Sequence, residues 1–123
     1  MSSRVLIVDD EPDILFMIKV ILRSEGYEVV AASGVAEARA QLSEDNPDLV
    51  LLDLRLADGE GWDVLRDLRE DGRLERVPVV ILSAHASPGT IQRALSEGAA
   101  GYVTKPFVTS ELVGAVREHA YGN

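Results

Sequence analysis

The sequence predicts an α/β fold in which five strand–helix pairs, (βα)5, form one doubly wound, five-stranded parallel sheet. Short apolar runs of strand length alternate with longer stretches of helical periodicity, which is the pattern of βαβ units. The runs at 5–8, 49–52 and 79–82 are continuously apolar, as expected when helices cover both faces of a sheet. With 123 residues and no linker or internal repeat, the chain is expected to form a single domain over 1–123.

The first two helices are bounded by residues that start and stop helices. Pro12 stands in the first turn of the first helix and Gly26 lies past its end, where these residue types are favoured. The second helix is expected to begin after Ser33 and to end near Pro47, because proline disfavours helical geometry in the residue before it. Its expected inward face carries Val35, Ala38 and Leu42. The accompanying strands are expected at 4–8, 27–31 and 49–53.

The second half of the chain repeats this pattern. A flexible connection is expected at 57–61, before the third helix. Ser87 and Pro88 predict the cap and first turn of the fourth helix, Gly98 predicts its end, and the last helix runs to about Tyr121. The expected inward residues of these three helices are Trp62, Leu65 and Leu68; Ile91, Ala94 and Leu95; and Leu112, Ala115 and Val116. The remaining strands are expected at 77–83 and 100–103.

Polar residues follow four of the apolar runs, and they are Asp9 and Asp10, Asp53, Ser83, and Lys105. Each has an ordinary explanation when taken alone, such as a helix-capping acid or a solvated charge. The carboxyl ends of parallel strands, however, open onto one crevice, so these side chains are expected to meet there. Three carboxylates, a hydroxyl and an ammonium suit a divalent cation and a phosphoryl group, with an aspartate as the acceptor.

The chemistry of this set follows from its charges. Close carboxylates repel one another unless a cation joins them, and Mg²⁺ prefers oxygen ligands, which Asp10 and Asp53 offer. With that charge neutralised, a carboxylate can attack phosphorus and form an acyl phosphate. Lys105 and Ser83 would bind the phosphoryl oxygens, because phosphoryl transfer relies mainly on positioning and electrostatics.

Composition excludes several other classes of protein. The chain has no cysteine, so it offers no disulfide, thiolate zinc site or thiol nucleophile. A net charge of −9 argues against direct nucleic-acid binding, which depends on clustered Lys and Arg. No apolar run approaches the roughly 20 residues of a membrane span, and no signal region precedes the first strand. Cytoplasmic location without membrane contact is therefore expected.

On these residues the chain resembles the receiver domain of bacterial two-component response regulators, and in particular the chemotaxis regulators. The residues that carry the resemblance are Val8-Asp9-Asp10-Glu11, Leu52-Asp53 with Gly61 eight positions later, Ser83-Ala84, and Tyr102 before Lys105-Pro106-Phe107. The resemblance covers the full length and implies a flavodoxin-like sheet with strand order 2-1-3-4-5. It also implies a phosphoacceptor that takes its phosphoryl group from a histidine kinase or a histidine phosphotransfer protein. Such a domain catalyses only its own phosphorylation and dephosphorylation and is not otherwise an enzyme.

The resemblance implies a role for each site residue. Asp53 is the phosphoacceptor, and Asp9, Asp10, Asp53 and the backbone carbonyl of Arg55 hold Mg²⁺. Ser83 and Lys105 contact the phosphoryl group.

Three further residues, Tyr102, Pro106 and Ala84, have implied structural or switching roles. Tyr102 is the switch aromatic that turns inward as Ser83 shifts, which remodels the surface of the fourth helix, fifth strand and last helix. That surface would control a partner or effector domain, or form a homodimer. The Lys105-Pro106 bond is expected to be cis. Ala84 is small, which leaves phosphoryl donors a path to the acceptor.

Three positions depart from the family pattern or add to it. Ala57 stands where the family often has proline, so the connection before the third helix is expected to be looser. Arg55 and His85 lie two residues beyond site residues, at positions that tune hydrolysis in the family. We hypothesise that Arg55 shields or pairs with the phosphoryl group and slows its loss. An unchanged decay rate in Arg55→Ala would refute this and favour a solvated arginine.

The first helix carries more apolar residues than its core face needs. Phe16, Met17 and Val20 are left partly outward, and an exposed apolar patch often marks a partner surface. In the family the first helix faces the histidine-bearing helices of a kinase or phosphotransfer protein, so docking is favoured. Extra core burial is the alternative.

Three rival functions are weaker. A pseudo-receiver would keep the fold and signal without phosphate, but the complete set of acids, Ser83 and Lys105 argues against it. An aspartate-nucleophile phosphatase of the haloacid dehalogenase type would need Asp-x-Asp after the first strand, where this chain has Asp9-Asp10, and room for a cap domain. A nucleotide triphosphatase would need a Gly-x-x-x-x-Gly-Lys-Ser/Thr run, which the sequence lacks.

Overall fold

The computed structural model describes residues 3–84 and 87–121. Its main sheet has five parallel strands in the order β2-β1-β3-β6-β7, which is the expected order 2-1-3-4-5. The strands are β1 (Arg4–Val8), β2 (Glu28–Ala32), β3 (Leu49–Leu52), β6 (Val79–Ser83) and β7 (Gly101–Thr104). The flavodoxin-like α/β fold is thus confirmed, with strand boundaries within two residues of those expected.

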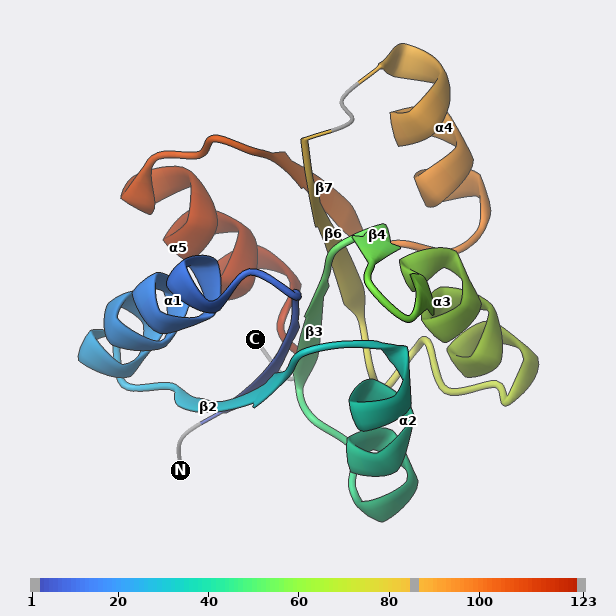
Figure 1. Ribbon diagram of the computed structural model, residues 1–123, viewed down its shortest axis with the longest axis horizontal. Helices are drawn as coiled ribbons and strands as arrows, with labels where there is room; N and C mark the ends of the chain where they lie inside the picture. The colour runs from blue at the N-terminus through green and yellow to red at the C-terminus, as the bar shows by residue number, and fades with distance from the viewer. Residues whose placement is uncertain (1–2, 85–86, 122–123) are drawn as a thin grey trace.

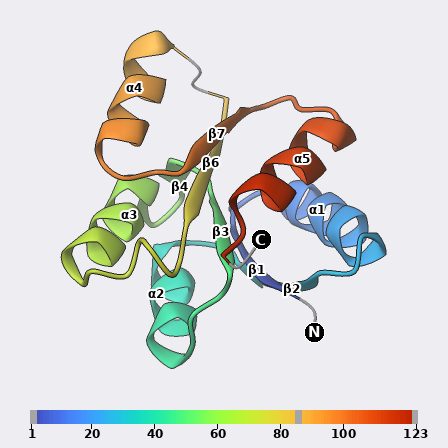
Figure 2. The same ribbon diagram turned by 180° about the vertical axis from the view of Figure 1, so that it is seen from behind.

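Helices cover both faces of this sheet, as Figures 1 and 2 show. They are α1 (Pro12–Ser24), α2 (Val35–Glu44), α3 (Gly61–Glu70), α4 (Pro88–Ser96) and α5 (Thr109–His119). α1 and α5 lie on one face, and α2, α3 and α4 lie on the other. None of the helices within residues 3–84 and 87–121 has the length and apolar character needed to cross a bilayer.

The continuous apolar runs are explained by the two layers of core. Successive side chains of a strand point to opposite faces. Val5 and Ile7 of β1 therefore pack with α1 and α5, whereas Leu6 and Val8 pack with α2 and α3. All four side chains are buried, so an alternating pattern would have left one layer of helices without a core.

The expected helix boundaries are confirmed by local geometry. Pro12 begins α1, and Gly26 follows the helix with φ of 92°, in the region that favours glycine. Ser87 caps α4, because its hydroxyl oxygen accepts a hydrogen bond from the Thr90 backbone nitrogen at 3.2 Å. The Lys105-Pro106 peptide bond is cis, as expected.

Two expectations about local structure were wrong. The connection expected at 57–61 is instead an antiparallel hairpin of β4 (Arg55–Leu56) and β5 (Gly59–Glu60), and α3 begins at Gly61. Leu95 was expected to face the core, but 49% of it is exposed. α4 packs beside the edge strand β7, and Ala94 is its only buried residue among those described. Because α4 contacts the core mainly through the side that carries Ala94, the Leu95 side of the helix is left in solvent.

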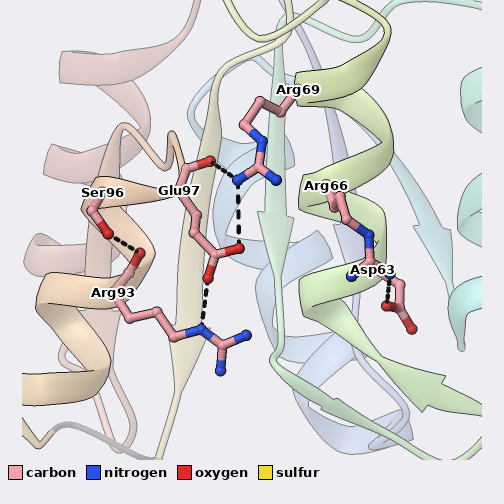
Figure 3. A network of polar contacts seen from close by, with 6 residues as sticks. All are labelled: Asp63, Arg66, Arg69, Arg93, Ser96 and Glu97. Carbon is pink, nitrogen blue, oxygen red and sulfur yellow. Dashed lines mark hydrogen bonds and ion pairs between the residues drawn. The ribbon is translucent and has the colours of Figure 1, made fainter.

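Hydrogen bonds and ion pairs link α4 to α3 (Figure 3). Arg93 donates from Nε to the Glu97 carboxylate at 2.6 Å, and Arg69 of α3 lies 3.4 Å from the same carboxylate. The Arg93 guanidinium also stacks over Trp62, 3.9 Å from the ring centroid. The hydrogen bond from Arg93 is the main cause that lowers the pKa of Glu97. These exposed contacts supplement the limited apolar packing of α4.

Candidate functional site

Four strand ends bring polar side chains to one edge of the main sheet. Asp9 and Asp10 follow β1, Asp53 follows β3, Ser83 ends β6, and Lys105 follows β7. One carboxylate oxygen from each of the three aspartates lies within 4.8 Å of the other two. The structure therefore brings together the residues that the sequence placed at the strand ends.

Backbone hydrogen bonds between neighbouring strands fix these positions. The amide of Asp53 donates to the carbonyl of Val8 at 2.9 Å, and the amide of Lys105 donates to the carbonyl of Ser83 at 2.9 Å. Each bond continues a ladder beyond the last strand residue. The site residues are consequently held by the sheet, although they lie at the start of loops.

The side chains surround a pocket of about 180 Å³. Its lining residues are Asp10, Glu11, Asp53, Arg55, Ser83, Ala84 and Lys105. Asp9 is fully buried beside them, whereas Ala84 is exposed. A small residue at this position leaves the pocket accessible from solvent.

The Lys105 ammonium lies among three carboxylates. Its Nζ is 2.5 Å from Asp9 Oδ2, 3.1 Å from Asp53 Oδ2 and 3.4 Å from Glu11 Oε1. The Asp9 side chain is fully buried, and a buried carboxylate is tolerated only when it is paired. Lys105 thus holds the acidic cluster together. Glu11 was not among the residues expected in the site, although its place beside the two aspartates was a usable signal.

Burial and charge act on both members of the central ion pair. Burial raises the pKa of Asp53, and the nearby Lys105 ammonium opposes this increase only in part. Burial lowers the pKa of Lys105, but its hydrogen bond to Asp9 and the charges of Asp53 and Asp9 outweigh this, so the pKa is raised overall. Lys105 therefore stays an ammonium at neutral pH. Burial therefore disfavours the charged form of Asp53, which a nearby cation would stabilise.

The cluster fits a divalent cation. Asp9, Asp10 and Asp53 offer three converging carboxylates, and one ammonium cannot neutralise them. Oxygen ligands of this kind are those that Mg²⁺ prefers. The Arg55 amide donates to Asp53 Oδ1 at 3.3 Å, which places the Arg55 backbone beside the carboxylate. The Arg55 side chain is exposed at the pocket, and its role in hydrolysis stays a prediction.

Ser83 links the pocket to Tyr102 of β7. Ser83 is fully buried, and Tyr102 is partly buried against the core. Burial raises the pKa of Tyr102, and a side-chain hydrogen bond with Ser83 opposes that increase. The two residues expected to form a switch are therefore in contact, with the tyrosine packed inward.

Of the remaining expected residues, the structure places the three apolar residues of α1 but does not describe His85. Phe16, Met17 and Val20 of α1 are 70%, 39% and 54% exposed, so extra core burial does not explain them. His85, expected to tune hydrolysis, lies outside the described residues.

The family model described as the response regulator receiver domain matches residues 5–117. The chain is 41% identical over 117 residues to the DNA-binding response regulator MtrA of Mycolicibacterium smegmatis, covering 95% of this chain and 50% of that protein. It is 44% identical over 113 residues to the transcriptional regulatory protein KdpE of Mycobacterium tuberculosis, covering 92% of this chain and 49% of that protein. The chain thus spans about half the length of these curated relatives.

Solved structures of similar proteins share the fold over nearly the whole chain. The chemotaxis protein CheY4 of Vibrio cholerae superposes with a TM-score of 0.89 at 27% identity, covering 97% of this chain and 99% of that one. The response regulator protein TrrA of Thermotoga maritima, in complex with Mg²⁺ and BeF, gives a TM-score of 0.84 at 32% identity. That match covers 94% of this chain and 97% of the other.

Proposed function

Because the chain belongs to the response regulator receiver domain family, we propose that it accepts a phosphoryl group on Asp53 in a two-component signalling system. The observation that carries this assignment is the cluster of Asp9, Asp10 and Asp53, in which the Lys105 ammonium pairs with the buried Asp9 and Asp53. The donor is a phosphohistidine of a histidine kinase or a phosphotransfer protein.

The transfer is an in-line displacement at phosphorus. An Asp53 carboxylate oxygen forms the new O–P bond while the N–P bond of the phosphohistidine breaks, and the imidazole leaves with that electron pair. Lys105 and Ser83 bind the oxygens of the transferred group, Lys105 by exchanging part of its contact with Asp53. Asp9, Asp10, Asp53 and the Arg55 carbonyl would hold Mg²⁺, which supplies positive charge to both the carboxylates and the phosphoryl group.

The output is a change of surface. Ser83 moves toward the phosphoryl group, which stabilises the inward position of Tyr102 through the hydrogen bond between the two side chains. This shifts an equilibrium between two arrangements of the surface formed by α4, β7 and α5. A downstream protein, an effector domain or a second copy of the chain would read that surface.

The wider biological context is part of the same proposal. The matched half of MtrA belongs to a protein named as DNA-binding, so the rest of such a protein is a natural effector. The expectation that the receiver domain itself does not contact nucleic acid stays a prediction, as does a single domain over 1–123. We place the domain in the cytoplasm, where it catalyses only its own phosphorylation and dephosphorylation.

Intact-mass spectrometry after incubation with acetyl phosphate tests the assignment. We expect a gain of one phosphoryl group with Mg²⁺ and none when a chelator replaces the cation. If the folded protein gains no phosphoryl group with Mg²⁺ present, the phosphate-independent pseudo-receiver becomes the better reading.

We expect charge substitutions on α1 to separate two routes of phosphorylation. Phe16→Glu with Val20→Glu should slow transfer from the cognate kinase roughly tenfold, equivalent to about 1.4 kcal/mol of docking free energy. Uptake from acetyl phosphate should stay unchanged, because both side chains are exposed and neither lines the pocket that holds Asp53. Quench-flow or gel assays of the two reactions provide the measurement.

Leu95→Glu is the matched control, since Leu95 is a similarly exposed apolar residue on α4. Equal slowing by the control would indicate a general charge effect rather than docking on α1.

A further inference from the structure

The hairpin after the phosphoacceptor is fastened to α2 by one side chain. Asp58 lies in the turn between β4 and β5, and its carboxylate accepts hydrogen bonds from two backbone amides of α2. Oδ1 is 2.8 Å from the nitrogen of Val35, and Oδ2 is 3.1 Å from the nitrogen of Ala36. Amides in the first turn have no partner inside their own helix. The hydrogen bonds from Val35 and Ala36 also lower the pKa of Asp58, so it remains ionised at neutral pH.

The sequence of α2 leaves room for this contact. Gly34 occupies the N-cap position and has no side chain with which to cap the helix. A Cβ atom on Gly34 would lie 2.5 Å from Asp58 Oδ1 and 2.9 Å from its Cγ. The cap of α2 is therefore supplied from the hairpin, at a position that any side chain on residue 34 would obstruct.

The other end of the same hairpin carries the site. The Arg55 amide, at the start of β4, donates to the Asp53 carboxylate at 3.3 Å. Between the two ends, Leu56 is buried in the same core cluster as Val35 of α2. The backbone at Gly59 also approaches α2 closely, since a Cβ there would lie 3.2 Å from Val35 Cγ2. A displacement of the hairpin tip would consequently move the backbone that contacts Asp53.

We propose that Asp58 is a positioning residue for the phosphoacceptor site, because it anchors the 55–60 hairpin to α2 and so fixes the Arg55 backbone beside Asp53. This inference rests on the proposed function and adds a residue to it. Ala57 stands where the family often has proline, so the restraint at this turn comes from the Asp58 carboxylate instead. The looser connection expected from Ala57 stays a prediction.

Two variants separate positioning from simple helix capping. Asp58→Ala removes both the cap of α2 and the anchor of the hairpin. Adding Gly34→Ser to Asp58→Ala gives α2 a cap of its own, since serine is favoured at that position and Gly34 has an extended backbone. The double variant therefore restores the cap without restoring the anchor.

Three measurements are made on each protein. Hydrogen exchange of the Arg55 amide in Mg²⁺-free protein reports the contact with Asp53, calorimetric titration gives the Mg²⁺ affinity, and thermal unfolding reports the cap. We expect faster Arg55 exchange and roughly tenfold weaker Mg²⁺ binding in Asp58→Ala, as for other residues that orient metal ligands. The double variant should recover the unfolding midpoint but neither the exchange rate nor the affinity.

Recovery of all three properties in the double variant would overturn the proposal and leave Asp58 as a cap only. Wild-type exchange and affinity in Asp58→Ala would overturn it as well. Failure of the phosphoacceptor assignment is distinguishable, because it would appear as no phosphoryl uptake by the wild-type protein. Arg55 exchange and Mg²⁺ titration need no phosphorylation and would still report on Asp58.

Discussion

Asp53→Asn is expected to abolish phosphoryl uptake from acetyl phosphate while the fold is retained. The amide has nearly the shape of the carboxylate but is neutral, so it cannot serve as the nucleophile or share a cation. Burial raises the pKa of Asp53, which means that the ionised carboxylate costs the folded state stability. Removing this charge should therefore leave the unfolding midpoint in chelator equal or higher. Intact-mass spectrometry and thermal unfolding check the two expectations.

Mg²⁺ provides a second comparison for the same variant. A cation at 100 times its Kd stabilises a protein by about 2.7 kcal/mol, and this gain should shrink in Asp53→Asn. Asp13→Asn is the matched control, because Asp13 is an exposed acid in the first turn of α1. Phosphoryl uptake by Asp53→Asn at the wild-type level would identify a different acceptor.

Gly61→Ala is expected to damage both stability and phosphorylation. A Cβ atom at this position would lie 2.0 Å from the carbonyl oxygen of Asp53 and 3.1 Å from the Cα of Leu54. Both contacts are with backbone atoms, so a side-chain rotation cannot relieve them. We expect a loss of roughly 1–3 kcal/mol in the free energy of unfolding, as for other overpacked sites. Phosphoryl uptake should slow by about 100-fold if the acceptor moves by 1 Å.

Gly114→Ala is the control for this substitution. Gly114 lies within α5, and a Cβ there would meet no atom within 4 Å outside its own helix. Alanine is favoured over glycine in a helix by about 1 kcal/mol, so this variant should be neutral or more stable. Denaturant unfolding and the acetyl phosphate assay measure both proteins. Wild-type stability and uptake in Gly61→Ala would mean that the loop after β3 relaxes at no cost.

Much of the site follows from local sequence, because parallel strands bring their carboxyl ends to one edge. The positions of Asp53, Ser83 and Lys105 after their apolar runs were sufficient to predict that they meet. Local sequence did not predict the role of Asp58, because its hydrogen-bond partners Val35 and Ala36 lie in the distant helix α2. Local sequence likewise could not explain why residue 61 is glycine, since a Cβ atom there would clash with the backbone carbonyl oxygen of Asp53.

The sequence by itself determined the layers of the fold, because continuous apolar strands can be buried only between two sets of helices. It also determined which functional groups the site contains, namely three carboxylates, a hydroxyl and an ammonium. Only the tertiary structure decided which face of α4 is buried. Leu95 is exposed because the edge strand offers that helix few contacts. Only the tertiary structure decided the hairpin at 55–60, because its anchor joins residues distant in the chain. Hydrophobic periodicity indicates which face of a single helix or strand is buried. The exposure of Leu95 and the anchoring of the hairpin depend instead on how two elements pack together.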